Sequence, residues 1–133
     1  MTGTVATRLA YTVESDRPFD DAVAAVEAEA AAAGFRVLHV HDVAATLASK
    51  GFDREPYKIV EVCQAAAAHE ALGKEPLVGL LMPCKINAWT HGGKTVLSAI
   101  RPALLAEFFP EHDLGDLAAR VERQIVGIVD RAR

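Results

Sequence analysis

The chain has 133 residues, the usual length of one compact domain and enough to bury a single hydrophobic core. Its net charge is −4 at pH 7, and it has no basic stripe of the kind that neutralises nucleic-acid phosphates. No apolar run approaches the roughly 20 residues that span a bilayer, so we expect one domain over residues 1–133 that binds neither nucleic acid nor membrane.

The first residues show neither the positive nor the apolar segment of a secretion signal, and we therefore expect a cytoplasmic protein. Thiols stay reduced in that compartment. The two cysteines, Cys63 and Cys84, are therefore expected to be free thiols that come near each other without forming a disulfide.

Hydrophobic periodicity and turn residues predict a single series of short elements. Strands with alternating or continuous apolar residues are expected over 7–14, 35–41, 57–63, 77–89 (interrupted at Pro83) and 95–100. A Gly-Gly hairpin turn over 91–94 separates the last two strands. Helices are expected from residue 20 or 21 to 33, over 42–50, over 64–72 and over 114–131.

This order of elements favours an α+β domain of two layers, with a mainly antiparallel sheet and the two main helices on one face. The other face must then be solvated or covered by a partner chain. Because apolar residues such as Val37 and Ile59 are expected on that open face, we expect the chain to form a homodimer.

Two blocks carry a family resemblance: residues 58–63 (KIVEVC) and 79–85 (GLLMPCK). With further blocks at 19–22, 34–38 and 101–102, they resemble the domain-of-unknown-function family 302 over nearly the whole chain. The resemblance implies a β-α-β-β-β-β-α arrangement, similar to the sheet of the TATA-binding protein and often paired as a dimer. It implies no activity. The chain departs from the family where Gln64-Ala65 replaces the frequent Asn-Pro and Ala88-Trp89 the frequent Tyr-Glu.

Strand alternation predicts a polar cluster on the open face. If Leu38, Val40, Val60 and Val62 pack under the helices, the opposite face receives Val37, Ile59 and four polar side chains. These four are His39, His41, Glu61 and Cys63. We expect at least three of them to share a concave pocket, with His39 or His41 within reach of Glu61. Cys84 and Lys85, beside the break at Pro83, could join the same ligand-binding site.

Three interpretations of this cluster remain open. His39, His41 and Cys63 could bind zinc or a related ion, with Glu61 as a further ligand. Cys63 and Cys84 could instead meet across strands and cycle between thiol and disulfide. The third interpretation is a polar sheet face with both cysteines as small buried hydrophobes.

No motif of known catalytic mechanism occurs, and neither an enzymatic activity nor a cofactor can be assigned from the sequence. The leading hypothesis is a small homodimeric accessory or binding protein that holds a metal ion or small ligand over the open face. One alternative is a thiol-redox enzyme that uses Cys63 and Cys84, and another is a purely structural interaction module.

Overall fold

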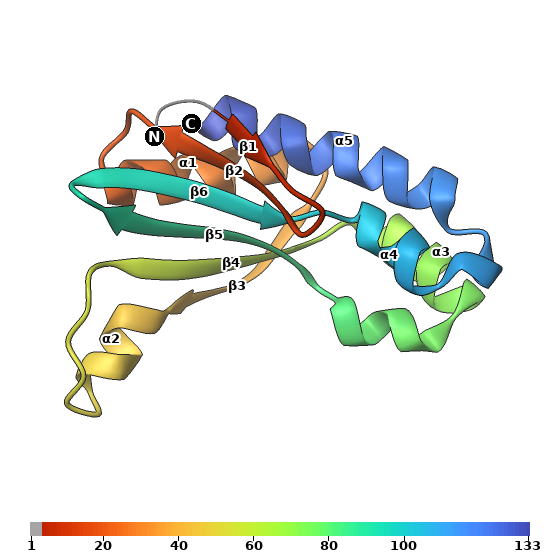
Figure 1. The fold of residues 1–133 in the computed structure, drawn as a ribbon, viewed down its shortest axis with the longest axis horizontal. Helices are drawn as coiled ribbons and strands as arrows, with labels where there is room; N and C mark the ends of the chain where they lie inside the picture. Colours follow the sequence, from red (N-terminus) through yellow and green to blue (C-terminus); the bar gives the residue numbers. More distant parts are fainter. Residues whose placement is uncertain (1–3) are drawn as a thin grey trace.

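The computed structural model describes residues 4–133, which form a six-stranded antiparallel sheet in the order β1-β2-β6-β5-β4-β3 (Figure 1). The strands are β1 (Thr4–Ala6), β2 (Ala10–Ser15), β3 (Arg36–Asp42), β4 (Tyr57–Cys63), β5 (Cys84–His91) and β6 (Lys94–Ile100). The helices are α1 (Phe19–Ala32), α2 (Val43–Ala48), α3 (Ala65–Lys74), α4 (Ala103–Phe108) and α5 (Gly115–Ala132), with 3₁₀ turns η1 (Pro76–Leu81) and η2 (Pro110–His112).

The two long helices, α1 and α5, pack against each other and against the same face of the sheet (Figure 1). Val60, Val62, Ile86 and Leu97 point toward them from the strands and are fully buried. The predicted α+β domain with an antiparallel sheet is therefore confirmed. None of the helices in residues 4–133 is long and apolar enough to cross a membrane.

Strand β3 contains a bulge that changes the expected assignment of faces. Its register with β4 shifts between Val37 and His39, so that Leu38 is the extra residue. Val37 and Val40 both pair with buried residues of β4 and pack against the core, whereas Leu38 is 48% exposed. The prediction was right for Val40 and wrong for Leu38 and Val37. His39 and His41 lie on the open face, as predicted, because both follow the bulge and flank Val40, which packs against the core.

The strand expected over 77–89 begins later than predicted. Residues Pro76–Leu81 form η1, and β5 starts only at Cys84, directly after Pro83. Pro76 occupies the first turn of η1, and the Glu75 side chain accepts a hydrogen bond from Leu77 N at 2.8 Å. A proline at the start and an acidic cap favour a helical turn over an extended chain.

The hairpin between β5 and β6 has the predicted turn. His91 pairs with Lys94, and Gly92 and Gly93 between them have φ values of 57° and 78°. Two successive residues with positive φ are the requirement of the tight turn that joins twisted antiparallel strands. This turn aligns β5 with β6 and so sets which β5 side chains reach the open face.

The end of β6 is tied to α5 by a charged contact. Arg101 donates to Glu122 Oε2 at 2.9 and 3.2 Å, and Glu122 Oε1 accepts from the backbone N–H of Ala103 at 3.0 Å. The hydrogen bond and the charge of Glu122 raise the pKa of Arg101. This contact holds the start of α4 against α5.

Two leucine truncations test the assignment of faces. Leu97→Ala should lower the free energy of unfolding by about 2–5 kcal/mol, because it leaves a cavity in the core. Leu38→Ala should change it by no more than about 0.5 kcal/mol, because the bulge exposes this side chain. Urea denaturation of both variants measures the difference. Equal losses of stability would show that β3 is not bulged at Leu38.

Candidate functional site

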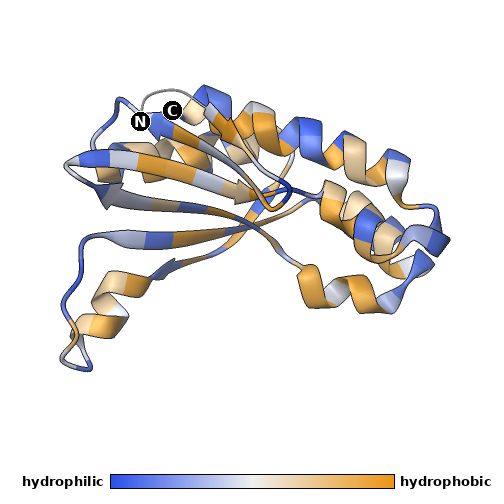
Figure 2. Ribbon diagram, in the orientation of Figure 1, coloured by the Kyte–Doolittle hydropathy of each residue, from blue (hydrophilic) through white to orange (hydrophobic). Residues whose placement is uncertain are grey.

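The face of the sheet opposite α1 and α5 is open but flanked on two sides. On one side α2 lies over β4, and on the other η1, the green segment between α3 and β5, projects beyond the sheet (Figure 1). Both flanking segments are mostly apolar (Figure 2). We call this surface the trough: the open face of β4, β5 and β6 with α2 and η1 as its walls.

Two hollows in the trough meet at one residue, Lys85. The larger hollow, of about 380 Å³, lies toward η1, and the smaller, of about 290 Å³, lies toward α2. The larger is lined by Leu9, Ala10, Tyr57, Leu80, Leu81, Lys85, Asn87, Trp89, Ser98 and Ile100. The smaller is lined by His41, Val43, Thr46, Leu47, Ile59, Glu61 and Lys85.

The Lys85 ammonium has no carboxylate partner among the described residues. Glu61 is its register partner on β4, but the Glu61 carboxylate lies 3.2 Å from His41 Nε2 instead. Lys85 Nζ donates only a long hydrogen bond of 3.4 Å to the carbonyl of Pro83. The trough therefore presents one half-buried cation that forms no ion pair with a carboxylate among the described residues, although Glu61 lines the smaller hollow with it.

An aromatic stack continues the floor of the larger hollow. The rings of Tyr57 and Trp89 lie parallel, with centroids 5.5 Å apart and planes 7° apart. The Arg54 guanidinium covers the Tyr57 ring at 4.9 Å, a cation–π contact. The Asn87 amide donates to the Tyr57 hydroxyl at 2.9 Å, and its other end has no partner among the described residues. These contacts fix the Tyr57 and Trp89 rings as a rigid, largely apolar surface.

The four predicted polar residues are only partly brought together. His41 reaches Glu61, as expected, and the rings of His39 and His41 lie edge to face at 4.3 Å. However, only His41 and Glu61 share a hollow, so the prediction of three residues in one pocket is wrong. His39 is exposed at the edge strand, and Cys63 lines a different cavity.

The predicted metal ligands do not assemble. Within residues 4–133, no group of three or more His, Cys, Asp or Glu side chains is arranged so that it could hold a metal ion. The reason is local: Cys63 is the last residue of β4 and turns toward α3, whereas His39 and His41 lie along β3. The structure therefore does not bring His39, His41 and Cys63 together as one set of ligands.

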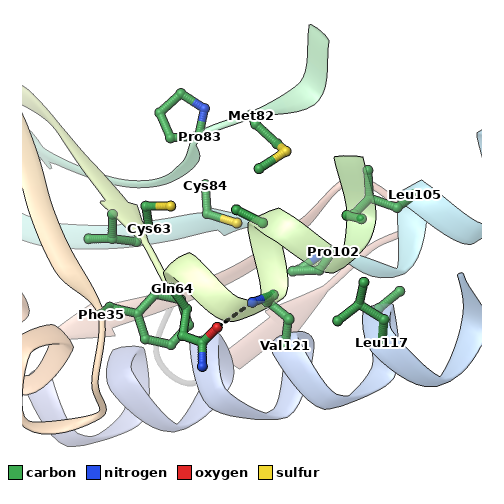
Figure 3. A pocket seen from close by; sticks show the side chains of 15 residues that line it. Phe35, Cys63, Gln64, Met82, Pro83, Cys84, Pro102, Leu105, Leu117 and Val121 are labelled. Atoms are coloured by element: carbon green, nitrogen blue, oxygen red, sulfur yellow. Dashed lines mark hydrogen bonds between the residues drawn. The ribbon is translucent and has the colours of Figure 1, made fainter. Parts of the chain in front are cut away.

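The two cysteines do come together, in a cavity between the end of β4, the start of β5 and the helices. Cys63 and Cys84 are free thiols that line the same cavity of about 50 Å³, together with Met82 (Figure 3). We call it the thiol cavity. The expectation that the two cysteines lie near each other is confirmed. Cys84 pairs in register with buried Val62, which places it on the helix-covered face rather than in the trough.

Burial and, to a smaller extent, the neighbouring Cys63 raise the pKa of the Cys84 thiol to about 11, although Lys85 lowers it. Cys84 is therefore a neutral thiol near pH 7. Because the thiolate is the reactive form, Cys84 is a poor nucleophile at that pH. This environment does not favour the rapid thiol–disulfide cycling of a redox enzyme.

The sequence contained a signal for part of the trough. Asn87 and Trp89 alternate with buried Ile86 and Ala88, so strand parity places them beside Lys85 on the open face. The walls could not be found in this way. Leu80 and Leu81 belong to a segment that hydrophobic periodicity predicted to be a strand. Helix α2 has no polar or charged side chain, apart from one threonine, that would have marked it as part of a site.

The fold and its two sites define a two-layer α+β domain with a flanked open sheet face and a buried pair of thiols. The family model described as "Domain of unknown function DUF302" matches residues 11–132, and the chain belongs to this family. It is also similar to a crystal structure of an uncharacterized conserved protein DUF302 from Bacillus stearothermophilus. That similarity has a TM-score of 0.88 and 30% identity, over 93% of this chain and 98% of the other. No curated protein matches the chain.

The alkylation rate of Cys84 tests its environment. In a Cys63→Ser variant, iodoacetamide should modify Cys84 at least about tenfold more slowly at pH 7.5 than a thiol with the ordinary pKa of 9.0, because burial, the largest cause of the raised pKa, remains when Cys63 is removed. The rate should still rise between pH 9 and 10, since a raised pKa keeps the thiol protonated there. A plateau below pH 9, in protein that circular dichroism shows to be folded, would contradict the raised pKa.

Proposed function

We propose that the domain is a binding protein for a small organic acid, whose apolar body lies in the trough and whose carboxylate pairs with Lys85. The observation that carries the proposal is the half-buried ammonium of Lys85, which joins two hollows and has no carboxylate partner among the described residues. An ion pair with a half-buried ammonium is more favourable than one with an exposed lysine, because water screens the half-buried charge less.

The side chains that line the larger hollow indicate the chemistry of the rest of the ligand. The larger hollow presents Leu9, Leu80 and Ile100 beside the Trp89 ring. Its volume of about 380 Å³ lies in the range of small-molecule sites, which are typically apolar with a few placed polar groups. A carboxylate on a short hydrocarbon chain or a single ring matches both features. A metal ion does not, because Lys85 would repel it.

The same surface also favours a second candidate, the homodimer interface predicted from the sequence. Leu9 and Leu80 at the rim of the larger hollow are 61% and 81% exposed. Val37, one of the two residues on which the prediction rested, packs against the core instead. A second copy seated on the trough would cover these leucines but would also exclude the ligand, so the two candidates are separable by experiment.

Trp89 supplies the signal for a direct test. It is the only tryptophan of the chain and lines the same hollow as Lys85. Octanoate should change its fluorescence at lower concentration than octanol does, and Lys85→Met should weaken octanoate binding by at least about tenfold. Lys94→Met is the matched control, because Lys94 lies in the exposed hairpin turn away from the trough. This control should bind like the unchanged chain.

Equal effects of octanoate and octanol, or equal affinities of the two lysine variants, would contradict an acid site at Lys85. Light scattering on the same samples separates the second candidate. A mass near twice 14.2 kDa that Leu80→Asp halves would show that the trough is an interface instead.

A further inference from the structure

Three sulfur atoms share the thiol cavity. Cys63 contributes one from the end of β4, Cys84 one from the start of β5, and Met82 one from the residue after η1 (Figure 3). All three side chains line the same cavity of about 50 Å³.

The remaining lining contains no hard ligand. No carboxylate, imidazole or amine lines the thiol cavity, and the one polar side chain, Gln64, accepts a hydrogen bond from Ala67 N at 2.6 Å. The other lining residues are alanines, prolines and larger apolar side chains, among them Phe35, Leu105 and Leu117. Thiolate and thioether donors in apolar surroundings select soft cations such as Cu(I) over Mg²⁺ or Ca²⁺.

The strand register favours an ion over a disulfide between the two cysteines. Cys84 lies opposite Val62, and Cys63 is the next residue along β4, so the two cysteines are diagonal neighbours and not directly opposed partners. A disulfide requires the two Cβ atoms to lie roughly 3.5–4.5 Å apart. An ion bound to both sulfurs spans a longer gap, because it inserts one metal–sulfur bond at each end.

The charges also balance in this arrangement. Two thiols that bind a monovalent cation release two protons to solvent, neither sulfur changes its oxidation state, and the complex carries one negative charge. Lys85, the next residue along β5, places an ammonium on the opposite side of that strand, where it offsets this negative charge. A complex with an uncompensated charge would be costly in an apolar cavity.

We propose that Cys63, Cys84 and Met82 form a binding site for one soft monovalent cation of the Cu(I) class, enclosed between the ends of β4 and β5 and helices α3 and α5. The site is separate from the trough and does not rest on the proposed binding of an acid. Met82 distinguishes it from a simple thiol pair, because a disulfide or a redox cycle has no use for a thioether.

The test is a titration of the reduced full-length chain, without oxygen, with Ag(I) and with Cu(I). Ag(I) binds the same soft donors and does not drive thiol oxidation, so it separates binding from disulfide formation. Calorimetry with a competing dithiol should show one ion per chain, and a weakly buffered solution should receive two protons per ion. Cys63→Ser and Cys84→Ser should each weaken binding by about a hundredfold and reduce the proton release to one.

Met82→Leu keeps the volume of the side chain but removes the sulfur, and it should weaken binding several-fold while still releasing two protons. Leu105→Val, in the same lining, is the packing control: it removes a methylene but no sulfur and should weaken binding less than Met82→Leu does. Affinity that is unchanged in Met82→Leu, or no binding above that of a free dithiol, would overturn the three-sulfur site. Binding that survives in both serine variants would do the same.

Discussion

Both long helices pack on the same face of the sheet, so alternate residues of each strand are buried while their neighbours face the other way. Val60, Val62, Ile86 and Leu97 are removed from water completely, at a gain of roughly 25 cal/mol for each Å² of apolar surface. A slip of one residue in β4 or β5 would expose the buried valines or Ile86 and bury Glu61 or Lys85. Because helices cover only one face of the sheet, burial of that face specifies the register of the strands. The register in turn places Lys85, Asn87 and Trp89 together in the trough.

Strand β4 shows how much of this arrangement the sequence contains. Its bounds, 57–63, and the burial of Val60 and Val62 follow from alternation alone, and the position of Glu61 on the open face follows with them. Strand β3 shows the limit. A bulge adds one residue without changing composition, so nothing in the run from Arg36 to Asp42 marks Leu38 as the extra residue. The histidines reached the expected face only because they follow the bulge.

The segment before β5 was misjudged for a different reason. An apolar run bounded by prolines is compatible with a buried strand, and periodicity cannot separate it from a short helical turn. Here Glu75 and Pro76 start η1, which turns Leu80 outward as a wall of the trough. The same shift moves the start of β5 to Cys84, so that Cys84 joins Cys63 in the thiol cavity instead of the predicted polar cluster.

Strand β5 connects the two sites because adjacent residues of a strand point to opposite faces. The Cys84 side chain lines the thiol cavity, and the Lys85 side chain lines the trough. One ammonium thus acts on both proposed sites: it would pair with an acid on the open face, and it lowers the pKa of the Cys84 thiol behind it. An acid bound at Lys85 would neutralise this charge, and the two sites would then oppose each other.

The central claim, that the trough rather than the helical layer receives the ligand, is tested most directly by nuclear magnetic resonance. Octanoate added to isotopically labelled protein should shift the signals of Lys85, Asn87, Leu80 and the Trp89 indole. All of these shifts should saturate at the same octanoate concentration. The signals of α1 and of the outer face of α5 should stay in place. Shifts concentrated on α1 and α5, or spread over the whole chain without saturation, would contradict the account.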